Sequence, residues 1–220
     1  MPHEKDRITS LDRVRSSRSL GHRSGLIASR TIELARKAKG LQLADDLEVV
    51  FPDKHLQAAV RGELKKPEGP ITRGDLKELG ELRDDGISIE DLSGLEHAVN
   101  LTRLDLGEKR ISGISPLASL TNLEWLNLEH NQISDITPLA SLTNLTEIGL
   151  LNNQISDISP LASLTNLERL DLSRNQVRDV GPLAALSNLE RLDLRHNPLS
   201  QESVVVHVPA LRSKGVYVDL

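Results

Sequence analysis

The sequence predicts an α/β solenoid in which short parallel strands stack coil upon coil, and two observations lead to this fold class. Four nearly identical segments begin at Leu101, Leu123, Leu145 and Leu167, 22 residues apart. The chain contains one Phe, one Trp and one Tyr, so its core must be mainly aliphatic. A period of roughly 20–50 residues is typical of a solenoid, because each unit can bury its apolar side chains only against its neighbours.

The first 47 residues differ from the rest of the chain in charge. They hold ten Lys and Arg against six Asp and Glu, a balance of +4, whereas residues 48–220 hold 17 against 26, a balance of −9. Residues 13–30 contain five Arg, five Ser and no acid, a composition that weakly resembles a transit peptide. We expect residues 1–47 to be a leader that is disordered or that results from a wrongly assigned start of the sequence. Residues 31–47 could form a helix.

Residues 48–78 are predicted to form a helical N-terminal cap. Leu56, Ala59, Val60 and Leu64 follow helical spacing and predict a helix over 53–64. A cap is needed at this position because the first coil would otherwise expose its leucines to water.

The repeats occupy residues 79–199, and each unit combines a strand with a turn-rich return path. In the unit from Leu123 the apolar positions are Leu123, Leu126, Leu128, Ile133, Ile136, Leu139 and Leu142. The spacing around Leu126 and Leu128 predicts a short strand, because alternate side chains of a strand point to the same side. The return path is too short for a long helix, and its Ser/Thr-Pro pairs predict an extended residue before each proline.

An Asn recurs in an otherwise apolar stretch of the repeat, at Asn131, Asn153, Asn175 and Asn197. A buried amide must be hydrogen-bonded or it costs a few kcal/mol, so these side chains are predicted to form a ladder between turns. A row of ligand-binding amides is the alternative. Lys109 and Ile87 occupy the same position in the first two units, so the ladder should start at Asn131.

Residues 200–220 are predicted to form a C-terminal cap of one short helix and one strand. Ser200 can cap a helix in which Val204, Val208 and Leu211 share one face, and Pro209 should shorten or kink it. The alternation after Gly215 predicts a last strand over 216–218.

The repeat block LxxLxLxxNxIxDIxPLxxL resembles the repeat of the bacterial internalins. The resemblance extends upstream to Val49-Val50-Phe51-Pro52-Asp53 and Asp91-Leu92-Ser93-Gly94-Leu95-Glu96, and covers residues 49–220. It implies a right-handed leucine-rich-repeat solenoid with its parallel β-sheet on the concave face, where that family grips protein ligands. The chain departs from the family pattern because it shows no secretory signal or sorting motif, and because its predicted face is poor in aromatic residues.

The residues between the buried strand positions should face outward and bind a partner. Their identities change from coil to coil while the leucines do not. The predicted protein-binding residues are Arg103, Asp105, Trp125, Asn127, Glu129, Glu147, Leu151, Arg169, Asp171, Arg191, Asp193 and Arg195. Trp125 is either a binding hot spot or a ring covering Arg103 or His130. Arg169, Arg174, Arg191 and Arg195 either receive an acidic partner or pair with neighbouring Asp residues.

The composition argues against other classes of function. An acidic body disfavours nucleic-acid binding, zero cysteine removes thiolate chemistry, and no apolar run is long enough to span a membrane. Ser173 with His196 lacks an orienting group, and His130 with Glu108 and Asp105 is a thin ligand set, so no catalytic, metal or cofactor site is expected. The sequence predicts a monomeric, non-enzymatic scaffold that binds a protein; the alternatives are a cytoplasmic adaptor and a self-assembling repeat protein.

Overall fold

Seven three-residue parallel strands, one from each successive coil, form a single sheet in the order of the sequence. Neighbouring strands pair without any shift, so that Leu104 lies beside Leu126 and Leu126 beside Ile148. The central residue of each strand is buried beneath the sheet. The strands are β1 (Glu81–Arg83), β2 (Arg103–Asp105), β3 (Trp125–Asn127), β4 (Glu147–Gly149), β5 (Arg169–Asp171), β6 (Arg191–Asp193) and β7 (Tyr217–Asp219).

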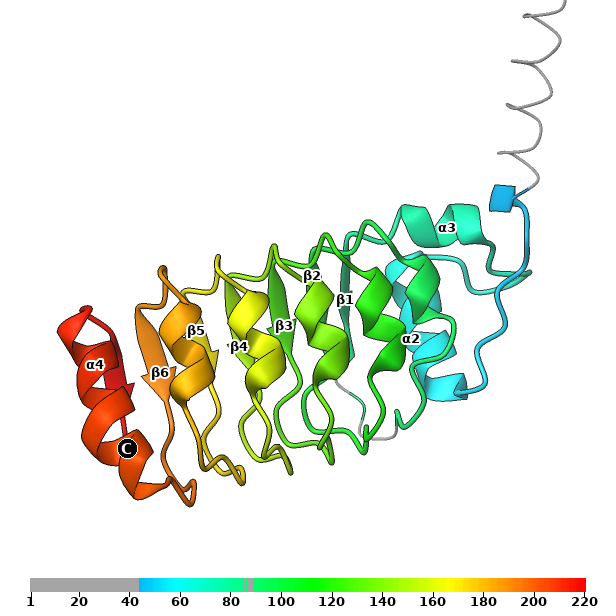
Figure 1. Cartoon of the computed structure of the whole chain (residues 1–220). Coiled ribbons are helices and arrows are strands. Elements are labelled where there is room, and N and C mark those ends of the chain that lie inside the picture. Colours follow the sequence, from blue (N-terminus) through cyan, green and yellow to red (C-terminus); the bar gives the residue numbers. More distant parts are fainter. Residues whose placement is uncertain (1–43, 85, 87–88) are drawn as a thin grey trace, which may run out of the picture. The chain divides into compact units, whose positions relative to one another are not determined.

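This computed structural model describes residues 44–84, 86 and 89–220. Leu47–Leu220 forms a compact unit of its own, which contains all seven strands (Figure 1). The leader predicted for 1–47 lies outside the described residues except for its last four. Ile87, the second residue predicted to interrupt the Asn ladder, also lies outside them.

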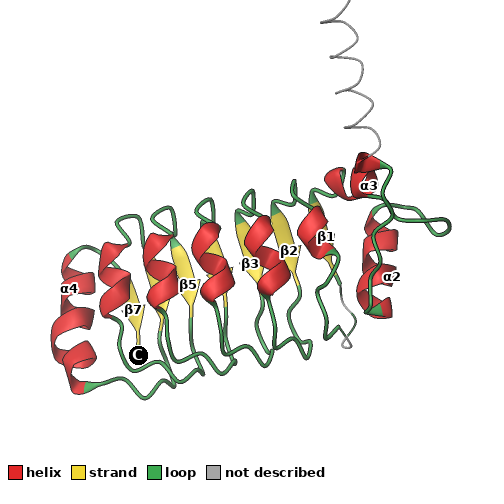
Figure 2. Cartoon of the chain, turned by 45° about the vertical axis from the view of Figure 1, so that its right-hand side comes forward, coloured by secondary structure: helices red, strands yellow, loops and turns green. Residues whose placement is uncertain are grey.

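Short 3₁₀ helices lie on the side of each coil opposite the sheet (Figure 2). The leucines between these two layers are fully buried and form one continuous aliphatic core. This arrangement confirms the predicted right-handed leucine-rich-repeat solenoid, with the sheet on its concave face. The 3₁₀ helices are Leu95–His97, Ser115–Ser119, Thr137–Ser141, Ser159–Ser163 and Gly181–Ala185.

The prediction of an extended residue before each proline is wrong. Thr137, which precedes Pro138, is already the first residue of its 3₁₀ helix, and Ile136 before it has φ −108° and ψ 15°. The Oδ1 atom of Asp135 accepts a 2.8 Å hydrogen bond from the Thr137 N–H and fixes the start of this turn. Asp157 and Asp179 cap the next two turns in the same way. The 3₁₀ helix that starts at Ser115 begins in the same way although Gly113 takes the place of this Asp, so the path of the coil itself, and not the cap alone, outweighs the steric preference of the residue before proline.

The buried Asn side chains form the predicted ladder. Asn153 Oδ1 accepts from the N–H of Ile133 at 3.0 Å, and its Nδ2 donates to the carbonyls of Leu128 and Leu150 at 2.9 and 3.1 Å. Asn131 repeats these bonds one coil earlier, and Asn175 and Asn197 repeat them one and two coils later. The ladder thus links each coil to the preceding one, and these amides are committed to structure rather than to a ligand.

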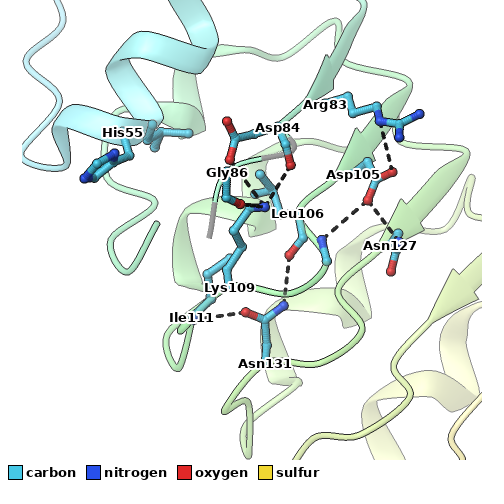
Figure 3. Close-up of polar contacts among 12 residues, drawn as sticks. His55, Arg83, Asp84, Gly86, Asp105, Leu106, Lys109, Ile111, Asn127 and Asn131 are labelled. Carbon is cyan, nitrogen blue, oxygen red and sulfur yellow. Dashed lines mark hydrogen bonds and ion pairs between the residues drawn. The ribbon is translucent and has the colours of Figure 1, made fainter. Parts of the chain in front are cut away.

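Lys109 occupies the ladder position in the coil before Asn131 and takes over part of its role (Figure 3). Its side chain is buried, and its Nζ donates to the carbonyls of Asp84, at 2.8 Å, and Gly86. The ammonium also lies 3.3 Å from the Asp84 carboxylate. The prediction that the Asn bonds begin at Asn131 is confirmed, but Lys109 extends the ladder by one coil because its ammonium can bind several carbonyls at once.

A second row of Asn side chains runs along the end of each repeat, where it is exposed to solvent. Asn144 Nδ2 donates to the carbonyl of Thr121 at 2.9 Å. Equivalent bonds are formed by Asn100, Asn122, Asn166 and Asn188. The Asn that closes each unit in the sequence is therefore a coil-to-coil link as well.

The N-terminal cap is α2 (Lys54–Glu63) followed by α3 (Arg73–Lys77). Asp53 caps α2 through Oδ1, and its Oδ2 accepts from the N–H of Glu90 at 2.8 Å, so one carboxylate joins the cap to the first coil. Phe51 packs against Gly94, which has φ 99° and no room for a Cβ atom because Phe51 Cδ1 would lie 2.9 Å from it. The predicted helical cap is confirmed.

The C-terminal cap consists of a π-helical turn over Ser203–His207, α4 (Val208–Ser213) and β7. The residues that face the core are Ser203, Val208 and Leu211, so the prediction that Val204 shares their face is wrong. A π turn spaces equivalent positions five residues apart rather than four, which moves the inward position from Val204 to Ser203. The turn lies directly before the predicted Pro209 kink.

We predict that the two Asn rows contribute unequally to stability. Asn153→Ala leaves buried carbonyl and N–H groups without partners and should cost about 2–4 kcal/mol of unfolding free energy. Asn144→Ala is the matched control, since it removes one exposed bond and should cost less than about 1 kcal/mol. Urea denaturation of both variants tests this, and equal midpoints would show that the inner ladder is not special.

Candidate protein-binding face

The outward surface of the sheet, which we call the sheet face, carries all twelve predicted binding residues in columns along the solenoid. The strand pairing aligns Arg103, Trp125, Glu147, Arg169 and Arg191 in a first column. The last residue of each strand forms a central column of Asp105, Asn127, Gly149, Asp171 and Asp193. A third column follows the strands and contains Glu129, Leu151 and Arg195.

The central column belongs largely to the scaffold. Asn127 Oδ1 accepts from the N–H of Glu129 at 2.9 Å, and Asp171 Oδ1 accepts from the N–H of Ser173 at 2.8 Å. Asp105 and Asp193 cap their turns with the same bond to the residue two positions later. These four predicted binding residues therefore close the turn that leaves each strand, a role that sequence reasoning missed although Asp and Asn are typical of such turns.

Trp125 is half-buried because a neighbouring cation covers one side of its ring. The guanidinium carbon of Arg103 lies 4.6 Å from the ring centroid, a cation–π contact. Of the two covers that the sequence suggested, Arg103 is therefore the one observed. The pair lines a hollow of about 350 Å³ together with Glu81, Leu82, Arg83 and Asp105.

The arginines toward the C-terminal end differ in how far they are already paired. Arg195 binds the buried Asp193 carboxylate through Nε at 2.9 and 3.0 Å, and Arg169 lies 3.3 Å from Glu147. Arg191 lies over the Tyr217 ring at 5.5 Å. The predicted pairing with Asp is therefore observed for Arg195, whereas Arg169 pairs with Glu147 instead and Arg174 is not part of the lattice.

Glu129 is a half-buried carboxylate of the face whose pKa is raised. Gly149 leaves space beside it, since a Cβ atom there would lie 2.8 Å from Glu129 Oε1. Burial is the main cause that raises the pKa of Glu129, and the charges of Asp171 and Asp105 raise it further. The side chain borders a hollow of about 350 Å³ over Gly149, on whose far side lie Arg169, Arg191 and Arg195.

The residue after the third column is held in the left-handed region in five successive coils. Glu108, His130, Asn152, Arg174 and His196 have φ between 55° and 59°, and we call them the exit column. Asn and His are residue types that adopt this conformation more often than most, whereas Glu108 and Arg174 are not. Within the exit column, His130 and Asn152 are polar partners of each other, with Nδ1 of His130 3.0 Å from Nδ2 of Asn152.

The sheet face offers no support for the catalytic or metal-binding sets considered above. The Ser173 hydroxyl donates to Asp171 at 2.6 Å rather than to His196. Across residues 44–84, 86 and 89–220, no three His, Asp or Glu residues lie together in a way that could hold a metal ion. The same residues include no helix that is long and apolar enough to cross a membrane.

Comparisons with known proteins agree with this architecture. The family described as leucine-rich repeats in two copies matches residues 121–163 and 165–204. The structure of internalin C2 from Listeria monocytogenes is 33% identical, with a TM-score of 0.57, and the match covers 77% of this chain and 83% of that one. This chain belongs to the internalin-like leucine-rich-repeat family. The matched repeats and the internalin-like neighbours support a role as a protein-interaction scaffold.

A second internalin-like relative is longer than the present chain. Internalin F from Listeria monocytogenes has a TM-score of 0.62 and 28% identity, and the match covers 79% of this chain but 58% of that one. The present chain therefore spans little more than half the length of this relative. No curated protein sequence matches the present chain significantly.

We predict that Glu129→Gln stabilises the fold at neutral pH. Since the folded-state pKa of Glu129 is raised, ionisation opposes folding, and stability is lost as the pH rises through that pKa. Gln removes the charge at nearly the same volume, so the variant should melt at a higher temperature at pH 7. Below the usual glutamate pKa the two proteins should melt alike, whereas a constant difference from pH 3 to pH 7 would contradict an electrostatic cause.

Proposed function

We propose that this scaffold recognises a protein partner through the sheet face. The observation that carries the proposal is the contrast between the columns of one strand. The buried central position is Leu or Ile in every repeat strand from β1 to β6, while the first column changes from Arg to Trp to Glu to Arg. A scaffold position that packs against nothing is free to vary, and a row of such positions provides a specific surface.

The proposed contact residues are those that the fold does not use. The first and third columns supply them, with Trp125 as the aromatic anchor and Leu151 as a second apolar group. The stacked Arg103 supports the indole of Trp125 while leaving part of it accessible. An aromatic and arginine pair of this kind is typical of interface hot spots. We propose a binding role without catalysis or cofactor, and a monomeric protein before the partner binds.

The proposal predicts that partner capture depends on the sheet face. The full chain would be immobilised and exposed to lysate and surface extract of its own organism, beside Trp125→Ala and Leu151→Asp variants. Ala184→Asp is the matched control, because it adds a carboxylate to an exposed position on the opposite, 3₁₀-helical side. Trp125→Ala should weaken binding by about 2 kcal/mol or more.

A partner held by the wild type and by Ala184→Asp, but lost from both sheet-face variants, is the expected result. Capture of the same proteins by all four baits would move the binding site off the sheet face. Thermal melts of each variant separate loss of binding from loss of fold.

Self-assembly is a second candidate, and one observation favours it. Val204, Val205 and Val206 are 44%, 59% and 53% exposed on the C-terminal cap, so three adjacent apolar residues remain accessible to solvent. Exposed apolar clusters mark contact surfaces. Sedimentation over a hundredfold range of concentration tests this, with Val205→Asp as the variant. A monomer at every concentration would exclude self-association through these valines.

A further inference from the structure

Three residues of the exit column, His130, Arg174 and His196, border a hollow beside the proposed partner contacts. Its volume is about 390 Å³, and it is lined by His130, Leu151, Asp171, Ser173, Arg174, Arg195 and His196. We propose that this hollow binds an acidic side chain of the partner, with an aliphatic neighbour of that side chain resting on Leu151. The inference rests on the proposed function and specifies the chemistry of its partner.

Charge is the first argument, because Arg174 is exposed and not neutralised. Its side chain forms no ion pair and no hydrogen bond with any residue in the described part of the chain. Arg195, which also lines the hollow, is already bound to Asp193. A free guanidinium beside a paired one favours a carboxylate, which Arg can bind through two parallel hydrogen bonds.

The hydrogen-bond donors around the hollow support an acceptor ligand. Asn152 Nδ2 lies 3.0 Å from His130 Nδ1, and because the amide nitrogen can only donate, the neutral ring carries its proton on Nε2. His130 is thus a donor at its outer nitrogen. Asp171 is the one carboxylate of the lining, and it accepts from both the N–H and the hydroxyl of Ser173 at 2.8 and 2.6 Å. These bonds satisfy part of its acceptor capacity.

The backbone conformation of the exit column does not favour Arg174. Arg174 has φ of 56°, a conformation that costs roughly 1–2 kcal/mol for most L residues and much less for Gly or Asn, whereas His196, with φ of 59°, is a residue type that adopts it more readily. The coil itself does not require these side chains, since Asn152 occupies the same place one coil earlier. Every coil imposes this conformation at the exit column, so Arg174 is tolerated there although an Asn would fit the backbone better.

The surroundings favour an acidic peptide over a nucleic acid. Glu129 and Glu147 lie on the same face, and the chain carries a formal net charge of −5. A polyanion would meet these carboxylates along its length, whereas a single acidic side chain meets only the hollow. Leu151 adds an apolar contact that a phosphate backbone cannot use.

The test is selection of random linear peptides displayed on phage, with the full chain as the immobilised target. Selected peptides should be enriched in Asp or Glu next to an aliphatic residue. Their affinity should fall about tenfold or more in Arg174→Glu, and fall as the salt concentration rises. Arg174→Lys should retain part of the affinity. Arg178→Glu is the matched control, because Arg178 is also exposed but lies outside the hollow, and this variant should bind as the wild type does.

The outcomes separate this inference from the proposed function. Peptides without acidic enrichment that are nevertheless lost from Trp125→Ala would overturn the acidic hollow and leave the sheet face as the binding surface. Acidic peptides that bind Arg174→Glu as well as wild type would also overturn it. Selection of no peptide that depends on a sheet-face residue would overturn both. Thermal melts confirm that each variant is folded.

Discussion

The hydrogen bonds of the buried Asn side chains join each coil to the coil before it, and the rest of the structure depends on them. A three-residue strand supplies few backbone bonds of its own, so the inner turns would leave carbonyl and N–H groups unpaired in an apolar core. Asn153 and its equivalents satisfy those groups: the amide oxygen accepts from one N–H, and the amide nitrogen donates to two carbonyls. Because each bond spans a fixed number of residues, a coil of another length would break both the ladder and the leucine layers. The constant register follows, and with it the straight columns of the sheet face.

The same need for hydrogen bonds decides which outward residues can serve recognition. Where a strand ends, the chain turns sharply, and the central-column side chain caps the turn. Asp171 and Asn127 are therefore part of the framework although they point outward. Gly149 is the exception in this column, and the space that it leaves is bordered by Glu129. The residue type is thus free to vary in the first and third columns but is restricted in the central column. A partner's contacts should therefore fall on either side of the central column.

The sequence was sufficient for the leucine frame and the inner Asn ladder, but it missed the Asp and Asn caps of the central column and gave the wrong conformation before each proline. The period predicted the strands, the buried leucines and the role of Asn131, because the same constraint acts in every coil. It did not predict that Lys109 would bind the carbonyls of the preceding coil, since nothing in its spacing differs from a surface lysine. The π turn that exposes Val204 depends on how a single helix fits a single end of the solenoid. The raised pKa of Glu129 depends on distances between coils that only the structure provides.

The arginines of the sheet face show how pairing within the molecule sets what remains for a partner. The Arg169–Glu147 pair is exposed, and a pair of this kind contributes at most about 1 kcal/mol, so a partner can replace either member at little cost. Arg195 is different, because breaking its bonds would strand the buried Asp193 carboxylate. Arg191 is oriented by Tyr217, and Arg174 by its strained backbone alone. A carboxylate reaching this end of the sheet therefore gains most at Arg174, where it displaces no existing interaction except water.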